Sequence, residues 1–227
     1  MSNLEASKQD RKKPEPARNK GRPKHDDQRV GPDTIIAATK ELLQEQPYTE
    51  VNRRGVALKA GVAPGLIRYY FTDLTALLTH VLKDMIYELR SELVRISEGP
   101  GTAGEILGLR VRYLVGFFAE NPAFRQMFLD LVIQSESEWA QQTSVDLLRV
   151  AFGEFKAITE NAVSEDSMAE SIDPRFLYIL VFGGTEFFTT GSPIFKQLFG
   201  EQEWRGSLGD EYAEFLSSLI LQGIAPR

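Results

Sequence analysis

Cysteine is absent from the 227-residue sequence, and histidine occurs only as His25 and His80. The lack of cysteine excludes disulfide frameworks, thiolate zinc sites and cysteine nucleophiles. The two histidines lie far apart in the sequence and have no partner at the spacing of metal ligands. There is also no Ser-His-acid set and no phosphate loop of the Walker type. We therefore expect neither a metal nor a cofactor, and we expect that the protein is not an enzyme.

Long hydrophobic runs are also absent. The longest, Phe176 to Phe182, is followed by two glycines and is too short to cross a bilayer. The first residues are polar and charged, without the apolar region of a secretory signal. The sequence thus predicts a protein of the cytoplasm with no membrane partner. Its length and its 42% of hydrophobic residues suffice to bury a core.

Positive charge is scarce, with 26 Lys and Arg against 32 Asp and Glu, and it is unevenly distributed. Residues 1–72 hold 14 basic and nine acidic residues, whereas residues 73–227 hold 12 and 23. A basic end on an acidic body indicates a polyanion partner for that end. A solvated tail without a partner would give the same balance of charges, so charge alone does not distinguish it from a polyanion-binding end.

The periodicity of apolar residues predicts an all-α chain. Residues 1–31 lack any hydrophobic period, which is typical of a disordered basic arm. A first helix begins at Pro32, and a second, capped by Asn52, closes at Gly61. No convincing period-two run appears. The further expected helices begin at Pro64 and Leu74 and then span about 103–120, 122–135, 137–163, 173–190 and 207–222.

The second and third helices have the spacing of a helix-turn-helix unit, with Gly61-Val62-Ala63 between them. In such a unit the second helix enters the major groove and its first residues reach the base edges. Gly65 lets the backbone approach a duplex, and Arg68 can bind phosphate or guanine. A helical hairpin that only packs is the alternative. The candidate DNA contacts in this unit are Arg53, Arg54, Lys59, Pro64, Gly65, Leu66, Arg68, Tyr69 and Tyr70.

The stretch IIAATKELLQEQPYTEVNRRGVALKAGVAPGLIRYYFTDLTALL resembles the DNA-binding domain of the TetR family of transcriptional regulators. The matching parts are the amphipathic first helix, Tyr48 just after it, VALKAGVAPG and YYF. The resemblance covers about residues 33–82. It implies a homodimeric, ligand-responsive repressor with about nine helices per subunit. A three-helix domain would be joined by a long helix to a helical ligand-binding and dimerisation domain.

The sequence departs from the family pattern at four positions. Leu74 stands where a phosphate-binding lysine is usual, and Ala63 stands where Ser or Thr is usual. Leu66 replaces a common Thr, and Gly55 replaces an acidic or polar residue. The first two changes remove expected polar contacts with DNA. Arg68 and Lys59 are the candidates to supply these contacts instead.

The segment NKGRPK resembles the core of an AT-hook. Gly21 and Pro23 let an extended strand lie flat in a narrow groove, and Arg22 would enter the minor groove at A·T tracts. The sequence thus predicts a minor-groove arm of Lys20, Gly21, Arg22, Pro23 and Lys24. A basic tail that adds only sequence-independent affinity is the alternative.

Large aromatic residues are frequent after residue 100. At helical spacing they are typical of a core, but a ligand chamber between helices is lined in the same way, with a few polar groups that orient the ligand. An aromatic-rich chamber favours an apolar or aromatic effector. The candidate ligand contacts are Tyr113, Phe117, Phe128, Gln134, Phe155, Tyr178, Phe182 and Glu186.

The resemblance also implies an assembly and a mechanism. Helices at about 173–190 and 207–222 would pair into a four-helix bundle, and a two-fold dimer would read a palindromic operator with half-sites roughly 34 Å apart. A small-molecule effector would tilt the helix that begins at Leu74 and so spread the two DNA-binding domains of the dimer. It can do so only if it binds the spread state better than the state that fits DNA. The expected domains are the arm 1–31, the DNA-binding domain 32–80 and the effector and dimerisation domain 81–227. A helical small-molecule-binding module without sequence-specific DNA binding is the alternative.

Overall fold

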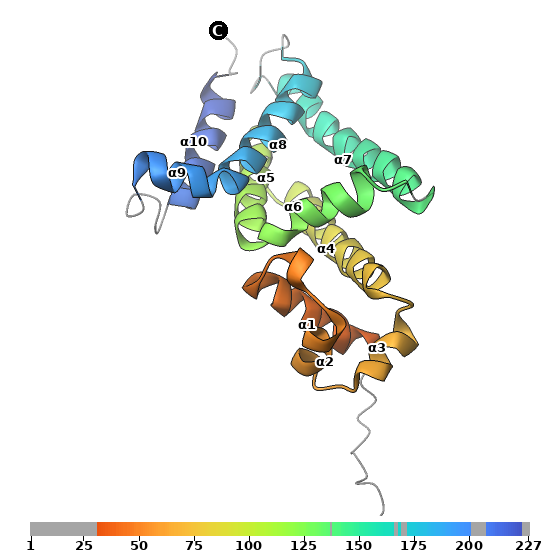
Figure 1. Ribbon diagram of the computed structural model, residues 1–227. Helices are drawn as coiled ribbons and strands as arrows, with labels where there is room; N and C mark the ends of the chain where they lie inside the picture. The colour runs from red at the N-terminus through yellow and green to blue at the C-terminus, as the bar shows by residue number, and fades with distance from the viewer. Residues whose placement is uncertain (1–30, 137, 166–167, 169–171, 201–207, 224–227) are drawn as a thin grey trace, which may run out of the picture. The chain divides into compact units, whose positions relative to one another are not determined.

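The computed structural model describes residues 31–136, 138–165, 168, 172–200 and 208–223 (Figure 1). Within these ranges the chain forms ten α-helices and two shorter helical turns, and no strand occurs. The prediction of an all-α fold is confirmed. The predicted arm, residues 1–31, lies outside the described residues except for Gly31.

Three short helices form the N-terminal group. Pro32 occupies the first turn of α1, where its missing N–H leaves no helical bond unmade. The Asn52 side chain accepts a hydrogen bond of 3.0 Å from the Gly55 N–H and so caps α2, as expected. Gly61 ends α2 at φ 66°, a left-handed conformation that favours glycine. The elements are α1 (Pro32–Glu45), η1 (Tyr48–Glu50), α2 (Arg53–Ala60) and α3 (Pro64–Tyr70).

The helix α4 (Leu74–Ser97) connects this group with the rest of the chain (Figure 1). Asp73 caps it by accepting a hydrogen bond of 2.7 Å from the Ala76 N–H. Its apolar stripe takes part in two hydrophobic clusters. Leu77 and Leu82 pack in the cluster that contains α1 and α3, whereas Leu93 packs in the cluster that contains α5, α7 and α8. The prediction that this helix contacts both parts of the protein is confirmed.

The C-terminal part is built around α5. A capping box of Thr102 and Glu105 starts this helix, which packs against α4, α7, α8 and α10. One helix, α9, was not predicted, because the expected helices at 173–190 and 207–222 left the residues between them without one. Pro193 instead lies in the first turn of α9, where proline is favoured. The elements are α5 (Ala103–Glu120), α6 (Pro122–Phe128), η2 (Leu129–Ile133), α7 (Glu138–Ser164), α8 (Pro174–Thr190), α9 (Ser192–Phe199) and α10 (Leu208–Gly223).

Candidate DNA-binding surface and effector cavity

The helix α3 presents polar and aromatic side chains on its outer face. Ile67 is 1% exposed and anchors the helix in the core beneath it. Tyr69 is 78% exposed, and its ring meets the Tyr70 ring edge-on at 5.0 Å between centroids. Pro64 and Arg68 are also exposed. This face therefore has the hydroxyl and guanidinium groups that bind phosphate and base edges.

Three arginines near α3 form no ion pair within the part of the chain that the structure describes. Arg68 lies on α3, and Arg53 and Arg54 lie in the first turn of α2, where backbone N–H groups also favour an anion. Among the described residues, none of the three forms an ion pair. Lys59 differs, because its ammonium group lies 2.7 Å from Glu45 and 3.4 Å from Glu41 of α1. The three arginines are therefore better placed to meet a polyanion than Lys59.

Two neighbouring residues at the start of α3 differ in what surrounds them. A Cβ atom at Gly65 would meet nothing within 4 Å, so packing inside the chain does not require glycine there. Leu66 is partly buried and packs against the core of the N-terminal group. The open space at Gly65 is consistent with close approach of another molecule, whereas part of Leu66 is committed to the fold. The predicted minor-groove residues Lys20, Gly21, Arg22, Pro23 and Lys24 lie outside the described residues.

A cavity of about 440 Å³ lies between α4, α5, α6, η2, α7 and α8. Its volume falls in the range of roughly 300–1,000 Å³ that is usual for small-molecule sites. Most of its lining is apolar. The apolar lining side chains include Ile86, Leu89, Leu93, Phe118, Phe124, Phe128, Leu129, Ile133, Leu147 and Phe182.

Four of the predicted ligand contacts line this cavity, namely Phe128, Tyr178, Phe182 and Glu186. The other four lie elsewhere. Phe117 packs in the core cluster shared by α1, α4 and α6, and Tyr113 packs beside it with ring centroids 6.2 Å apart. Phe155 lies behind the Tyr178 ring at 5.3 Å, and Gln134 is exposed after η2.

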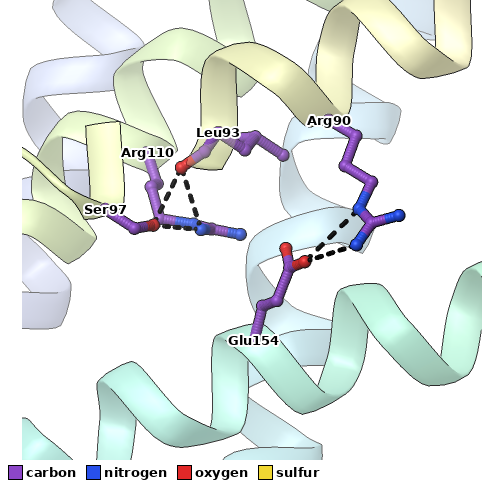
Figure 2. A network of polar contacts seen from close by, with 5 residues as sticks. All are labelled: Arg90, Leu93, Ser97, Arg110 and Glu154. Carbon is purple, nitrogen blue, oxygen red and sulfur yellow. Dashed lines mark hydrogen bonds and ion pairs between the residues drawn. The ribbon is translucent and has the colours of Figure 1, made fainter. Parts of the chain in front are cut away.

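Three arginines and two glutamates provide the charge of the lining. Arg90 donates two hydrogen bonds, of 3.2 and 3.3 Å, to one carboxylate oxygen of Glu154 (Figure 2). Arg125 forms an ion pair with Glu186. Arg110 is only 5% exposed and donates to two neutral acceptors, the Leu93 carbonyl at 3.2 Å and the Ser97 hydroxyl at 2.6 Å (Figure 2). Sequence reasoning missed all three arginines.

Tyr178 stands out among the aromatic residues of the lining. Its ring packs against Phe152, Phe155 and Phe182, with centroids 4.4–5.5 Å away. Burial raises the pKa of its hydroxyl to about 12, and the nearby Arg110 charge opposes this rise only weakly. Tyr178 is therefore a neutral hydrogen-bond donor at neutral pH.

The segment α6–η2 lies between the cavity and the N-terminal group. It contributes Phe128 and Leu129 to the cavity lining. On its other side, Asp130 accepts a hydrogen bond from the Tyr48 hydroxyl, which raises the pKa of Tyr48 to about 12. Asn121, just before α6, accepts a hydrogen bond of 3.2 Å from the Gln44 side chain of α1. One segment thus contacts both the cavity and the helix-turn-helix group.

A second hollow, of about 550 Å³, lies between α5 and α6 on one side and α8 and α9 on the other. Its lining includes Asn121, Gln126 and Thr190 and is about as polar as apolar. The smaller cavity is the better candidate for a small-molecule site, because apolar side chains with a few convergent polar groups are typical of such sites.

Large apolar side chains are exposed on α8, α9 and α10. In the single chain their exposed fractions range from 47% to 69%, on three consecutive helices. Many exposed large apolar side chains on consecutive helices are typical of an interaction site. We call these residues the apolar face: Phe176, Ile179, Leu180, Phe187, Ile194, Leu198, Phe199, Phe215 and Leu219.

Comparisons with known proteins agree with the helix-turn-helix unit and with the all-α fold. Residues 35–81 match the model of bacterial regulatory proteins of the tetR family. No curated protein sequence matches the chain. In the part of the chain that the structure describes, no helix is long and apolar enough to cross a membrane.

Several solved structures share the fold. A TetR/AcrR-family transcriptional regulator from Thermobifida fusca aligns over 85% of this chain and 97% of its own, with a TM-score of 0.65 and 18% identity. The regulator FadR from Bacillus subtilis, in complex with stearoyl-CoA, aligns over 85% and 98%, with a TM-score of 0.63 and 21% identity. The ketosteroid regulator KstR2 of Mycobacterium tuberculosis aligns over 86% and 95%, with a TM-score of 0.66 and 12% identity.

The helix-turn-helix unit and the all-α fold define a DNA-binding transcriptional regulator. Over residues 35–81 the chain is similar to the DNA-binding domain of the TetR family. The resemblance inferred from the sequence over about residues 33–82 is confirmed.

Proposed function

We propose that the protein is a homodimeric repressor that binds a palindromic operator and is released from it by a small, largely apolar effector. The observation that carries this proposal is the position of α6–η2, which lines the cavity with Phe128 and Leu129 and contacts the DNA-binding domain through Asp130 and Asn121. Operator DNA would place the protein in the cytoplasm. We expect no enzymatic activity.

The DNA contacts that we propose follow from exposure and charge. Arg68 and Tyr69 on α3 would reach base edges or phosphates in the major groove, and Arg53 and Arg54 would bind phosphate at the start of α2. Gly65 would let the backbone approach the duplex closely. The arm around Arg22 would add contacts in the minor groove.

The proposed dimer uses the apolar face. α8 and α10, which correspond to the expected helices at 173–190 and 207–222, carry most of it, and α9 extends it. A two-fold axis through this face would bury the same side chains on both subunits. It would also set the two α3 helices about one DNA turn apart, roughly 34 Å.

Coupling would run from the cavity through α6–η2 and α4. A ligand that pushes against Phe128 displaces the segment that carries Asp130. Because Asp130 is the hydrogen-bond partner of Tyr48, the displacement reaches the DNA-binding domain. Lys40 of α1 forms ion pairs with Asp84 and Glu88 of α4, so α4 also transmits motion to α1. The ligand releases DNA only to the extent that it binds the displaced state better.

Two observations support an apolar effector. The lining of the cavity is mainly Leu, Ile and Phe side chains. In addition, the structurally similar FadR from Bacillus subtilis was solved with stearoyl-CoA, a molecule with a long apolar chain. The predicted contacts Phe128, Tyr178 and Phe182 are in position to meet such a chain.

The experiment that tests the proposal is selection from a pool of random duplexes at near-physiological salt. We expect recovery of an inverted repeat with half-sites about one helical turn apart. Recovery of no preferred sequence, with binding that disappears as salt rises, would reduce DNA binding to sequence-independent charge. The cavity would then favour the helical small-molecule-binding module instead.

A further inference from the structure

The charges around the cavity leave one cation without an anion. Arg90 is matched by Glu154 and Arg125 by Glu186, each in an ion pair. Arg110 has no carboxylate within ion-pair distance among the described residues, although it is 5% exposed. A buried charge without a counterion is costly, so a buried arginine that lines a cavity is suited to bind an anion that enters it.

The contacts that Arg110 makes within the chain use only part of its guanidinium. One terminal nitrogen donates to the Leu93 carbonyl and the Ser97 hydroxyl, both near the end of α4. The other end of the guanidinium extends away from Ser97, toward the side on which Glu154 lies (Figure 2). These remaining N–H groups have no acceptor among the described residues, and Arg110 is part of the cavity lining.

A second donor lies close by. Tyr178 lines the same cavity, and its hydroxyl has no hydrogen-bond partner among the described residues. Burial keeps it protonated, since its pKa is raised to about 12. Arg110 and Tyr178 are therefore two donors in one apolar cavity. The Glu154 carboxylate, which Arg90 binds, offsets only part of the cost of burying Arg110, whose pKa burial lowers.

We propose that Arg110 and Tyr178 bind the carboxylate of an amphipathic effector whose apolar chain fills the rest of the cavity. The inference deepens the proposed function and rests on the effector cavity described above. A carboxylate supplies the single negative charge that Arg110 lacks, and its two oxygens match the planar fork of a guanidinium. The chain would lie against Leu89, Phe128 and Phe182.

The same contact explains how binding reaches α4. Arg110 holds the Leu93 carbonyl and the Ser97 hydroxyl in the last turns of α4. A carboxylate bound to the other side of the guanidinium would pull on both contacts. The effector headgroup is thereby linked to the helix that leads to the DNA-binding domain.

The test compares dodecanoate with methyl dodecanoate, its neutral ester, by isothermal titration calorimetry on the full chain, below the concentration at which micelles form. We expect dodecanoate to bind roughly tenfold to hundredfold more tightly, because hydrogen bonds between charged groups discriminate on this scale. Arg110→Gln should abolish this preference and leave the affinity for the ester within about twofold.

Arg112→Gln is the matched control. Arg112 lies on the same helix, is exposed and pairs with Glu214 of α10, so its replacement should leave the preference intact. Tyr178→Phe should reduce the preference in part, since it removes one neutral donor without changing the shape of the cavity. If circular dichroism shows that Arg110→Gln does not fold, the comparison of acid and ester on the unaltered protein and on Tyr178→Phe still tests the proposal.

Equal affinity for the acid and the ester in the unaltered protein would overturn the proposal, and so would an undiminished preference in a folded Arg110→Gln. Binding of neither compound, with octanoate and hexadecanoate giving the same result, would also overturn it. Calorimetry needs no DNA. Carboxylate binding without a selectable operator would therefore refute the repressor function while leaving the assignment of Arg110 standing.

Discussion

Arg68 is the side chain on which operator recognition should depend most, because it lies exposed on α3 and has no ion-pair partner among the described residues. We expect Arg68→Ala to weaken operator binding by about 1–3 kcal/mol if it reads a base, or to lower the salt dependence by about one unit of slope if it binds phosphate. Fluorescence anisotropy with a labelled operator at several salt concentrations measures both effects.

Arg149→Ala is the control for this change, since Arg149 is an exposed arginine on α7, outside the helix-turn-helix unit. It should change neither operator affinity nor its salt dependence. An Arg68→Ala protein that binds the operator as tightly as the Arg149→Ala protein would show that α3 does not face the DNA.

The helix ends within the candidate DNA-binding surface could be predicted because local sequence determines them. Asn52 as a cap and Gly61 as a left-handed helix end follow from residue type and spacing alone. The residues of the cavity could not be predicted in the same way. Arg110 lies on a helix among apolar residues, and only the packing of α4, α7 and α8 around it makes it a buried cation. Likewise, Glu186 was a candidate ligand contact, but the sequence does not show that it pairs with Arg125.

At the scale of elements, α6–η2 contacts both the cavity and the helix-turn-helix group. Its π-helical turn, Leu129–Ile133, places Asp130 toward Tyr48 and Leu129 toward the cavity. Such turns are often found at functional sites. The sequence predicted one continuous helix over 122–135, because periodicity does not register one extra residue in a turn.

Removing the link between Tyr48 and Asp130 should weaken the response to effector. We expect Tyr48→Phe to reduce the ratio between operator affinities without and with effector by up to about tenfold, because the lost hydrogen bond contributes about 0.5–1.5 kcal/mol. Calorimetric binding of the effector itself should remain, since Tyr48 does not line the cavity.

Tyr87→Phe serves as the comparison, because Tyr87 is a tyrosine of α4 that is 69% exposed. Operator binding in both variants is measured by anisotropy across an effector titration. An equal response in Tyr48→Phe and Tyr87→Phe would show that the signal does not pass through Asp130.

At the scale of the whole molecule, the apolar face should determine the oligomeric state. Ile179 of α8 is 65% exposed in the single chain. A two-fold axis would place a charge introduced at this position in the interface twice, once from each subunit. We expect Ile179→Glu to raise the dissociation constant of the dimer by at least about tenfold, because an unpaired charge is costly in an apolar interface. Sedimentation velocity measures this shift.

Val145→Glu, at an apolar position of α7 that is 52% exposed, should leave the dimer intact. The Ile179→Glu protein should also bind a single half-site almost normally and the full operator poorly. A dimer of unchanged stability in Ile179→Glu would place the interface on another surface.

In the proposed mechanism, operator and effector compete through one connected set of helices, from the cavity through α6–η2 and α4 to α3. The most direct measurement is the dissociation constant of the selected operator with and without saturating dodecanoate, together with that of dodecanoate with and without operator. We predict that both dissociation constants rise by the same factor, at least about fivefold, because coupling between two sites is reciprocal. Unchanged dissociation constants, with operator and dodecanoate bound to the protein at the same time, would contradict the account.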